Sequence, residues 1–168
     1  MNISGNTILI TGGASGIGKA LATRFLDRGN EVIVCGRREG MLNLLRSEHP
    51  PIQTIQCDVA GQSERETLVR QVMDKFPSLN VLVNNAGIQR RVDLNRTENW
   101  DDARAEIVIN LEAPIHLSTL FQERFRPKPH AAIINVTSGL SFMPLANVPI
   151  YCATKAALHS FTLSLRWQ

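Results

Sequence analysis

Short apolar runs alternate with longer stretches of mixed polarity along the chain, and this alternation predicts its secondary structure. Runs rich in apolar residues predict buried strands at 7–10, 31–35, 54–57, 81–83 and 131–136. Apolar residues spaced three or four apart predict helices over 19–28, 41–48, 63–75, 100–126 and from Tyr151 onward. Strands that alternate with helices are typical of a parallel sheet covered on both faces. The pattern therefore predicts an α/β fold.

Turn and capping residues mark several predicted helix ends. Gly29 is expected to end the first helix, and Pro50 to close the second. Ser63, with Glu66 three residues later, is expected to cap the third helix. No internal repeat, low-complexity stretch or linker interrupts the pattern, so we expect residues 1–168 to form a single domain.

Composition and charge exclude several classes of protein. The 168 residues are 43% hydrophobic and 20% charged, which suits a globular chain better than a disordered or fibrous one. The 18 basic and 15 acidic residues are scattered, which is too diffuse for a surface that binds nucleic acid. No apolar run is long enough to span a membrane, and a strand predicted from residue 7 leaves no room for a signal peptide. A cytoplasmic location is therefore expected.

Cysteine and histidine positions give no indication of a disulfide or metal site. Cys35, Cys57 and Cys152 lie far apart and form no C-x-x-C pair, so we expect free, small core residues in a reducing compartment. The four histidines lack the spacing of metal ligands. No metal is expected.

A glycine-rich stretch between the first strand and the first helix indicates a dinucleotide site. It reads Thr11-Gly12-Gly13-Ala14-Ser15-Gly16-Ile17-Gly18. Glycines allow a sharp turn and close approach of a pyrophosphate, whose charge is favoured by the free N–H groups at a helix start. The alternative is a turn that only connects strand to helix, and the order of strand, glycines and helix disfavours it.

The end of the second strand predicts which dinucleotide is bound. An acidic residue about 20 positions after the glycines would hold a ribose 2′-hydroxyl and select NAD. This chain has Gly36 there, followed by Arg37 and Arg38. A guanidinium can bind a 2′-phosphate through two hydrogen bonds, so we expect NADP(H) to be preferred over NAD(H), with Arg37 as the phosphate ligand. Arg38 could equally be a solvated surface residue.

Tyr151 and Lys155 are the candidate proton-transfer groups. Four residues apart on the predicted last helix, they share one face. A neighbouring ammonium stabilises a phenolate, which would let Tyr151 exchange a proton with a substrate oxygen. Ser138, thirteen residues before Tyr151, could hold that oxygen by a hydrogen bond. An isolated Y-x-x-x-K pair is weak support, and it gains weight from the glycine stretch.

Together these motifs resemble the short-chain dehydrogenase/reductase family, in the branch with T-G-x-x-x-G-x-G and Y-x-x-x-K. The resemblance covers the whole chain. It adds an adenine contact after the third strand, an N-A-G segment that lines the cofactor, and a helix asparagine that holds a water for proton relay. These correspond to Asp58 with Val59 beside it, Asn85-Ala86-Gly87, and Asn110.

The resemblance implies hydride transfer between a nicotinamide and a small-molecule carbonyl or secondary alcohol. The implied catalytic residues are Asn110, Ser138, Tyr151 and Lys155. The implied cofactor-binding residues are Gly12, Ser15, Gly16, Ile17, Gly18, Arg37, Asp58, Val59, Asn85, Ala86, Gly87, Tyr151 and Lys155. The implied fold is a Rossmann-like three-layer sandwich.

The end of the chain departs from the family pattern. Family members continue past Gln168 with a nicotinamide-contacting segment, a substrate lid and two further strands, so we expect a C-terminally truncated domain. Without those strands the sheet order is expected to be 3-2-1-4-5, which leaves the 131–136 strand at an edge. Apolar stripes on the helices that carry Asn110 and Tyr151, which family members use for pairing, predict a homodimer.

Two other functions compete with this interpretation. A dinucleotide-binding module, acting as a sensor or structural subunit, would bind the cofactor and form no product. A sugar-nucleotide epimerase of the extended branch is disfavoured, because three residues separate Gly12 from Gly16 where that branch usually has two.

Overall fold

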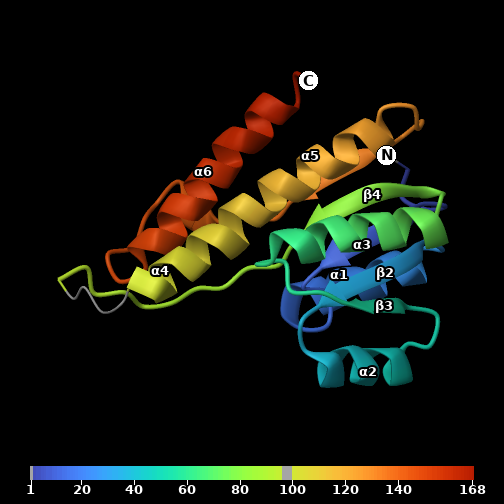
Figure 1. Cartoon of the computed structure of the whole chain (residues 1–168), viewed down its shortest axis with the longest axis horizontal. Helices are drawn as coiled ribbons and strands as arrows, with labels where there is room; N and C mark the ends of the chain where they lie inside the picture. Colours follow the sequence, from blue (N-terminus) through green and yellow to red (C-terminus); the bar gives the residue numbers. More distant parts are fainter. Residues whose placement is uncertain (1, 96–99) are drawn as a thin grey trace.

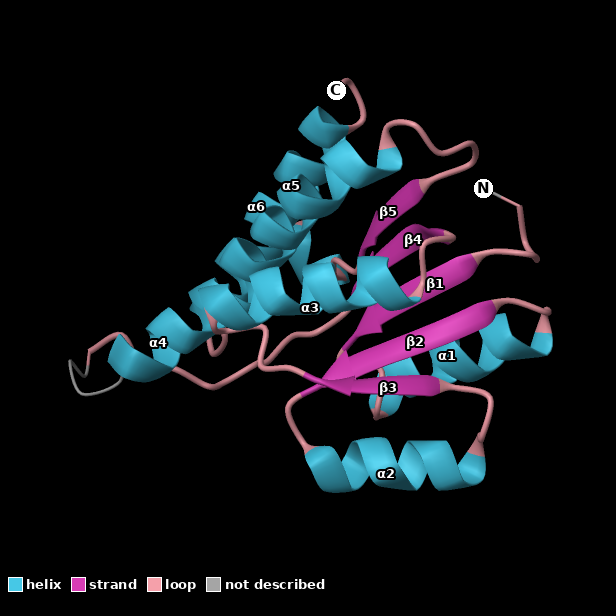
Figure 2. Cartoon of the chain, turned by 45° about the vertical axis from the view of Figure 1, so that its right-hand side comes forward, coloured by secondary structure: helices cyan, strands magenta, loops and turns pink. Residues whose placement is uncertain are grey.

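A parallel sheet organises the molecule. The computed structural model describes residues 2–95 and 100–168. Within these residues the strands are β1 (Thr7–Thr11), β2 (Glu31–Gly36), β3 (Gln53–Gln56), β4 (Leu79–Asn84) and β5 (Ala132–Asn135). Their order is β3-β2-β1-β4-β5, and neighbouring strands run parallel (Figure 2). The predicted order, with the last of these strands at an edge, is confirmed.

Helices cover both faces of the sheet (Figure 1). They are α1 (Gly16–Asp27), α2 (Glu39–Glu48), α3 (Gln62–Lys75), α4 (Trp100–Ile107), α5 (Ala113–Phe125) and α6 (Pro149–Leu165). Helices α1 and α2 pack on one face and α3 and α5 on the other. Helix α6 lies beside α4 and α5 (Figures 1 and 2). The predicted three-layer α/β fold is therefore confirmed.

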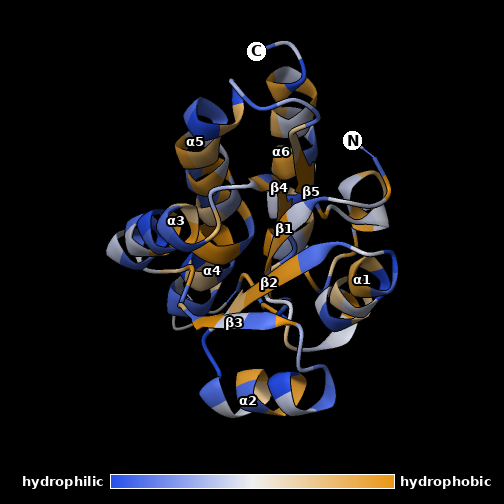
Figure 3. Ribbon diagram, turned by 90° about the vertical axis from the view of Figure 1, so that its right-hand side faces the viewer, coloured by the Kyte–Doolittle hydropathy of each residue, from blue (hydrophilic) through white to orange (hydrophobic). Residues whose placement is uncertain are grey.

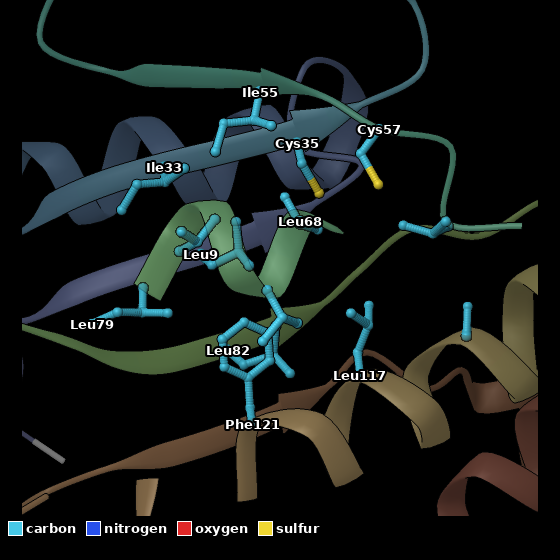
Figure 4. Packing of buried hydrophobic residues seen from close by; sticks show 14 of the residues in the cluster. Leu9, Ile33, Cys35, Ile55, Cys57, Leu68, Leu79, Leu82, Leu117 and Phe121 are labelled. Atoms are coloured by element: carbon cyan, nitrogen blue, oxygen red, sulfur yellow. The ribbon is translucent and has the colours of Figure 1, made fainter. Parts of the chain in front are cut away.

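The strands are apolar on both faces because both faces are covered. Successive side chains of a strand point to opposite sides, so Leu9 packs toward α3 and α5, whereas Ile8 and Ile10 pack toward α1 and α2. Figure 3 shows the resulting hydrophobic sheet between helices of mixed polarity. In Figure 4, Leu117 and Phe121 of α5 close the core on the α3 side. This packing explains why the strands lack the apolar and polar alternation of a half-exposed sheet.

Two predicted helix boundaries have different outcomes. Gly29 follows α1 with φ of 75°, a conformation that suits glycine, and the expected end of that helix is confirmed. The expected cap at Ser63 is wrong, because α3 begins at Gln62 and its N-cap is Gly61. The Glu64 carboxylate instead accepts the backbone N–H of Asp58 at 2.7 Å. The Glu64 side chain, in the first turn of α3, thus fixes the loop that precedes this helix.

The long helix predicted over 100–126 is interrupted. Helices α4 and α5 are joined by the π-helical turn Val108–Glu112, in which the Ala113 N–H bonds to the Val108 carbonyl five residues earlier. The helical spacing of apolar residues predicted the extent of this segment, and it did not predict the turn. Asn110 lies within the turn, so the irregularity sits at a predicted site residue.

Residues 2–95 and 100–168 contain neither a membrane-spanning helix nor a metal-binding cluster. No helix there is both long and apolar enough to cross a bilayer. No group of three or more His, Cys, Asp or Glu side chains in those two segments is arranged to hold a metal ion. The three cysteines are free and buried.

Candidate active site

A cavity of about 570 Å³ opens at the carboxyl ends of the parallel strands, the usual ligand-binding edge of such a sheet. Every predicted cofactor-binding residue except Gly16 lines this cavity. Of the four predicted catalytic residues, Tyr151 and Lys155 line it, and Asn110 and Ser138 do not. The fold thus brings the glycine loop and the proton-transfer pair, which are far apart in sequence, to one space.

Further lining residues were missed by the sequence interpretation. They are Ala14, Gly36, Arg38, Cys57, Ile88, Gln89, Ile109, Val136 and Thr137. Most are sequence neighbours of predicted residues and follow the ends of strands. Their place after a strand is the signal that could have found them, because the carboxyl ends of parallel strands share one edge.

The glycine loop forms a cradle that larger residues would fill. Gly12 has φ of 64°, and a Cβ there would lie 2.9 Å from the Cα of Ala86. A Cβ on Gly18 would lie 2.5 Å from the Gly12 carbonyl oxygen. Helix α1 starts at this loop without a side-chain cap, which leaves its first N–H groups for an anionic ligand. The loop therefore fits a pyrophosphate held close to the backbone.

Hydrogen bonds tie this loop to the end of β4. The Asn85 amide donates to the carbonyl oxygens of Thr11 and Gly12 at 2.9 and 3.2 Å. In return, the Thr11 hydroxyl oxygen accepts the N–H groups of Asn85 and Ala86, each at 3.0 Å. These reciprocal bonds fix the N-A-G segment against the glycine loop, so both sides of the cradle are preorganised.

Positive charge lies at the rim beyond Gly36. Arg37 and Arg38 both line the cavity, and their side chains are exposed. The Arg38 guanidinium donates to the Ser15 hydroxyl of the glycine loop at 2.9 Å. Arg38 is therefore part of the cavity rim rather than an unconnected surface residue. The arrangement offers two guanidinium groups to an anionic substituent.

Tyr151 and Lys155 lie together at the opposite end of the cavity. The Lys155 ammonium is 5.8 Å from the centre of the Tyr151 ring. Lys155 is almost fully buried and donates to the Val136 carbonyl at 2.8 Å. Burial lowers the pKa of the Lys155 ammonium, because the charged form loses solvation. The pair combines a phenol with a desolvated amine, an arrangement suited to proton transfer.

Asn110 supports this end of the cavity from behind. Its side chain is fully buried and pairs with both backbone groups of Ile88, accepting the N–H at 2.8 Å and donating to the carbonyl at 2.7 Å. A Cβ on Gly87 would lie 3.3 Å from the Asn110 amide oxygen and 3.6 Å from the Lys155 nitrogen. The Asn110 amide oxygen and the Lys155 nitrogen thus both lie close to the Cβ position of Gly87, where no larger residue would fit easily.

Ser138 lies next to the lining residue Thr137 and not in the lining itself. Its hydroxyl oxygen accepts the Leu140 N–H at 3.1 Å and caps the 3-10 turn Gly139–Ser141. Because the Ser138 hydroxyl is the acceptor in this bond, the bond does not use the hydroxyl proton. The structure therefore places Ser138 at the border of the cavity with one donor available.

A stripe of three side chains on α4 and the π turn holds the segment after the N-A-G sequence. Asp102 pairs with the Arg90 guanidinium, Glu106 accepts the Arg90 N–H, and Asn110 binds Ile88. Glu106 is fully buried, one of its oxygens has no partner among the described residues, and burial raises the pKa of its carboxyl. The spacing of four residues was the available signal for this stripe.

Comparison with known proteins extends over almost the whole chain. Residues 6–168 match the family model described as short chain dehydrogenase. The chain is 54% identical to "Uncharacterized oxidoreductase DltE" of Bacillus subtilis, over 100% of this chain and 67% of that protein. It is 33% identical to human "15-hydroxyprostaglandin dehydrogenase [NAD(+)]", over 98% of this chain and 62% of the human protein.

A solved structure shares the fold. The crystal structure of a short-chain dehydrogenase from Streptomyces avermitilis matches with a TM-score of 0.87 and 26% identity, over 95% of this chain and 59% of that one. The chain thus spans about three fifths to two thirds of the length of these proteins.

Proposed function

The chain belongs to the short-chain dehydrogenase family, whose members are oxidoreductases acting on CH–OH and C=O groups, and we propose that it binds NADP(H) and acts on a carbonyl or secondary alcohol. One observation carries this proposal. A single cavity connects a glycine loop suited to an anion with Tyr151 and the buried Lys155. A dinucleotide lying along it would have its phosphates at one end and its reactive ring at the other.

The proposed preference for NADP(H) rests on the residues at the cavity rim after β2. Position 36 is glycine instead of an acidic residue, and the next two residues, Arg37 and Arg38, line the cavity, with Arg38 bonded to Ser15. A carboxylate would repel a 2′-phosphate, whereas guanidinium groups bind it. The human relative carries NAD(+) in its name at 33% identity. The two proteins are therefore proposed to differ in cofactor at this rim.

The side chains at the Tyr151 end of the cavity are proposed to have different roles in proton transfer. When bound, the nicotinamide supplies or accepts the hydride. Tyr151 would give the proton to the substrate oxygen or take it, and Ser138 would donate its free proton to the same oxygen. Lys155 would hold the ribose hydroxyls and stabilise the ionised phenol. Asn110 would keep a water within reach of Lys155.

Assembly as a homodimer is proposed through the helices that carry Asn110 and Tyr151. Each of these helical segments has apolar side chains that are only partly buried within the chain. They are Leu111 and Ile115 near Asn110, and Phe161 and Leu165 of α6. Pairing these stripes across a twofold axis would cover them. We also propose a cytoplasmic location, because three buried free thiols suit a reducing compartment.

The proposed function is tested by binding first and turnover second. NADPH fluorescence titration should give a tighter dissociation constant than NADH, and a panel of ketones and aldehydes should then show NADPH oxidation. Product formation separates an enzyme from the alternative, a dinucleotide-binding module without turnover. Absence of any dinucleotide binding would overturn both functions.

A further inference from the structure

Cys57 forms part of the cavity wall. It directly follows β3, and its backbone N–H donates to the Gly36 carbonyl at 3.0 Å, which continues the sheet by one residue. Cys57 is one of the residues that line the cavity, beside Asp58 and Val59. Only 3% of the residue is exposed, and the cavity that it lines is the route by which a reagent would reach it. Any ligand that fills this part of the cavity would block that route.

A second thiol lies against Cys57. Cys35, at the end of β2, is fully buried in the same cluster, and Figure 4 shows both side chains on the face of the sheet that Leu68 covers. A hydrogen bond from Cys35 lowers the pKa of the Cys57 thiol, although burial opposes it. The same contact, together with burial, raises the pKa of Cys35 well above its usual range. The two pKa values therefore shift in opposite directions, and Cys57, unlike Cys35, lines the cavity.

Charged groups near Cys57 act in both directions. Arg65 favours the thiolate, whereas Glu64 and Asp58 disfavour it. Farther out, Arg37 and Arg38 bring positive charge to the mouth of the same cavity. A rim of this sign raises the local concentration of anions. Anionic reagents should therefore reach Cys57 faster than neutral ones of similar size.

We propose that Cys57 is a modification site for anionic low-molecular-weight disulfides, and that its modification excludes the dinucleotide. The Cys57 thiolate attacks one sulfur of the disulfide, the S–S bond breaks, and the other half leaves as a thiolate. The thiol proton passes to solvent and a mixed disulfide remains on Cys57. A second thiol reverses the reaction by the same exchange. The exclusion of the dinucleotide rests on the proposed function.

Cys152 supplies an internal control. It is a buried cysteine of α6 whose sulfur contacts the backbone N–H of Leu145 at 3.4 Å. It borders a separate apolar hollow with Leu140 and Pro149 and does not line the dinucleotide cavity. Cys152 therefore shares the burial of Cys57 and lacks both its thiol partner and its cavity.

The labelling experiment uses the full chain, near neutral pH, with the dianionic disulfide 5,5′-dithiobis(2-nitrobenzoate). One thiol should react first, on the order of tenfold faster than the others, and peptide mass mapping should place the label on Cys57. Cys57→Ser should remove the fast phase, Cys152→Ser should leave it unchanged, and Cys35→Ser should slow it severalfold. The neutral bis(2-hydroxyethyl) disulfide should react with Cys57 more slowly than the dianionic reagent. Arg37→Gln should reduce this difference in rate, because it removes positive charge from the rim. A first label on Cys35 or Cys152 in the unmodified chain would overturn the proposal.

Protection by the dinucleotide is measured separately. NADPH should slow the fast phase in proportion to its occupancy, which its own fluorescence reports, and the labelled chain should bind less NADPH. Binding without protection would refute the exclusion. If NADPH does not bind, the proposed function fails, whereas the order of labelling still decides whether Cys57 is the site.

Discussion

At the glycine-loop end of the cavity the binding groups are backbone N–H groups and exposed guanidinium groups, whereas at the Tyr151 end they are buried side chains. Arg37 and Arg38 face solvent, but Lys155 is 4% exposed and Asn110 is fully buried. Exposed charges contribute little and are screened by salt. Truncating a buried polar group leaves its partner unsatisfied. Single substitutions should therefore have unequal effects at the two ends.

The largest effect is expected from Tyr151→Phe at the buried end. Removing the phenolic hydroxyl takes away the proton donor, so carbonyl reduction should fall by roughly 10² to 10⁴, with the NADPH dissociation constant nearly unchanged. Steady-state rates and fluorescence titration on the same preparation measure both. Joint loss of turnover and binding would show that Tyr151 supports the fold, and the two ends would then not be separable.

At the glycine-loop end, a larger side chain should weaken NADPH binding more than a change of charge does. In Gly18→Ala the new Cβ would lie 2.5 Å from the Gly12 carbonyl oxygen, so the cradle must open. NADPH affinity should fall by roughly ten- to a hundredfold, equivalent to about 1.4 to 2.8 kcal/mol. Gly40→Ala is the matched control, because nothing lies within 4 Å of its Cβ position and it should bind NADPH normally. Normal binding by Gly18→Ala would mean that the cradle adapts.

A smaller effect is expected at the rim. Arg37→Asp should invert the preference for NADPH over NADH, with a change of about tenfold, because one charge-assisted contact is lost and a repulsion is added. The preference of the unmodified chain should also shrink as ionic strength rises. Arg46→Asp on α2 makes the same change of charge away from the cavity and should leave the order intact. Tighter NADH binding in the unmodified chain would contradict the assignment.

The smallest effect concerns the buried carboxyl behind the Tyr151 end. Because the folded chain raises the pKa of Glu106, the folded state binds the proton more tightly than the unfolded state does. The free energy of unfolding should therefore fall as pH rises from the ordinary carboxyl pKa through the raised one. Glu106→Gln keeps an amide oxygen for the Arg90 N–H and should flatten this dependence. Glu123→Gln on the surface of α5 should not, and an unchanged slope in Glu106→Gln would contradict the prediction.

The strands and the glycine loop were predictable because their causes are local. A strand buried on both faces needs an apolar run, and a pyrophosphate cradle needs small residues between strand and helix. Gly12, Gly18 and Arg37 could therefore be assigned to the cavity from sequence neighbours alone. The order of strands came from the family resemblance, and the structure agrees with it.

The parts that could not be predicted depend on contacts between distant segments. Arg65 lies on a helical segment that reads as polar, yet it is buried and donates to Glu112, His116 and the Val59 carbonyl. Its burial requires three segments to meet, which no local pattern encodes. Ser63 failed as a cap for a local reason, because α3 begins one residue earlier, at Gln62, with Gly61 as its N-cap.

The π turn at Val108–Glu112 has a consequence for how the chain tolerates changes of length. One such turn takes up a residue inserted into an α-helix, so the helical residues after it keep the facing that they would have without the insertion. In the present register Leu117, Phe121 and Phe125 meet the sheet while Asn110 meets Ile88. Deleting one residue within the turn, such as Val108, would restore an ordinary helix and leave Leu117, Phe121 and Phe125 facing the sheet, whereas deleting a residue from the middle of α5 would rotate the residues after it by about 100°. A deletion between α5 and β5 would change neither face, so the same one-residue loss should be tolerated there.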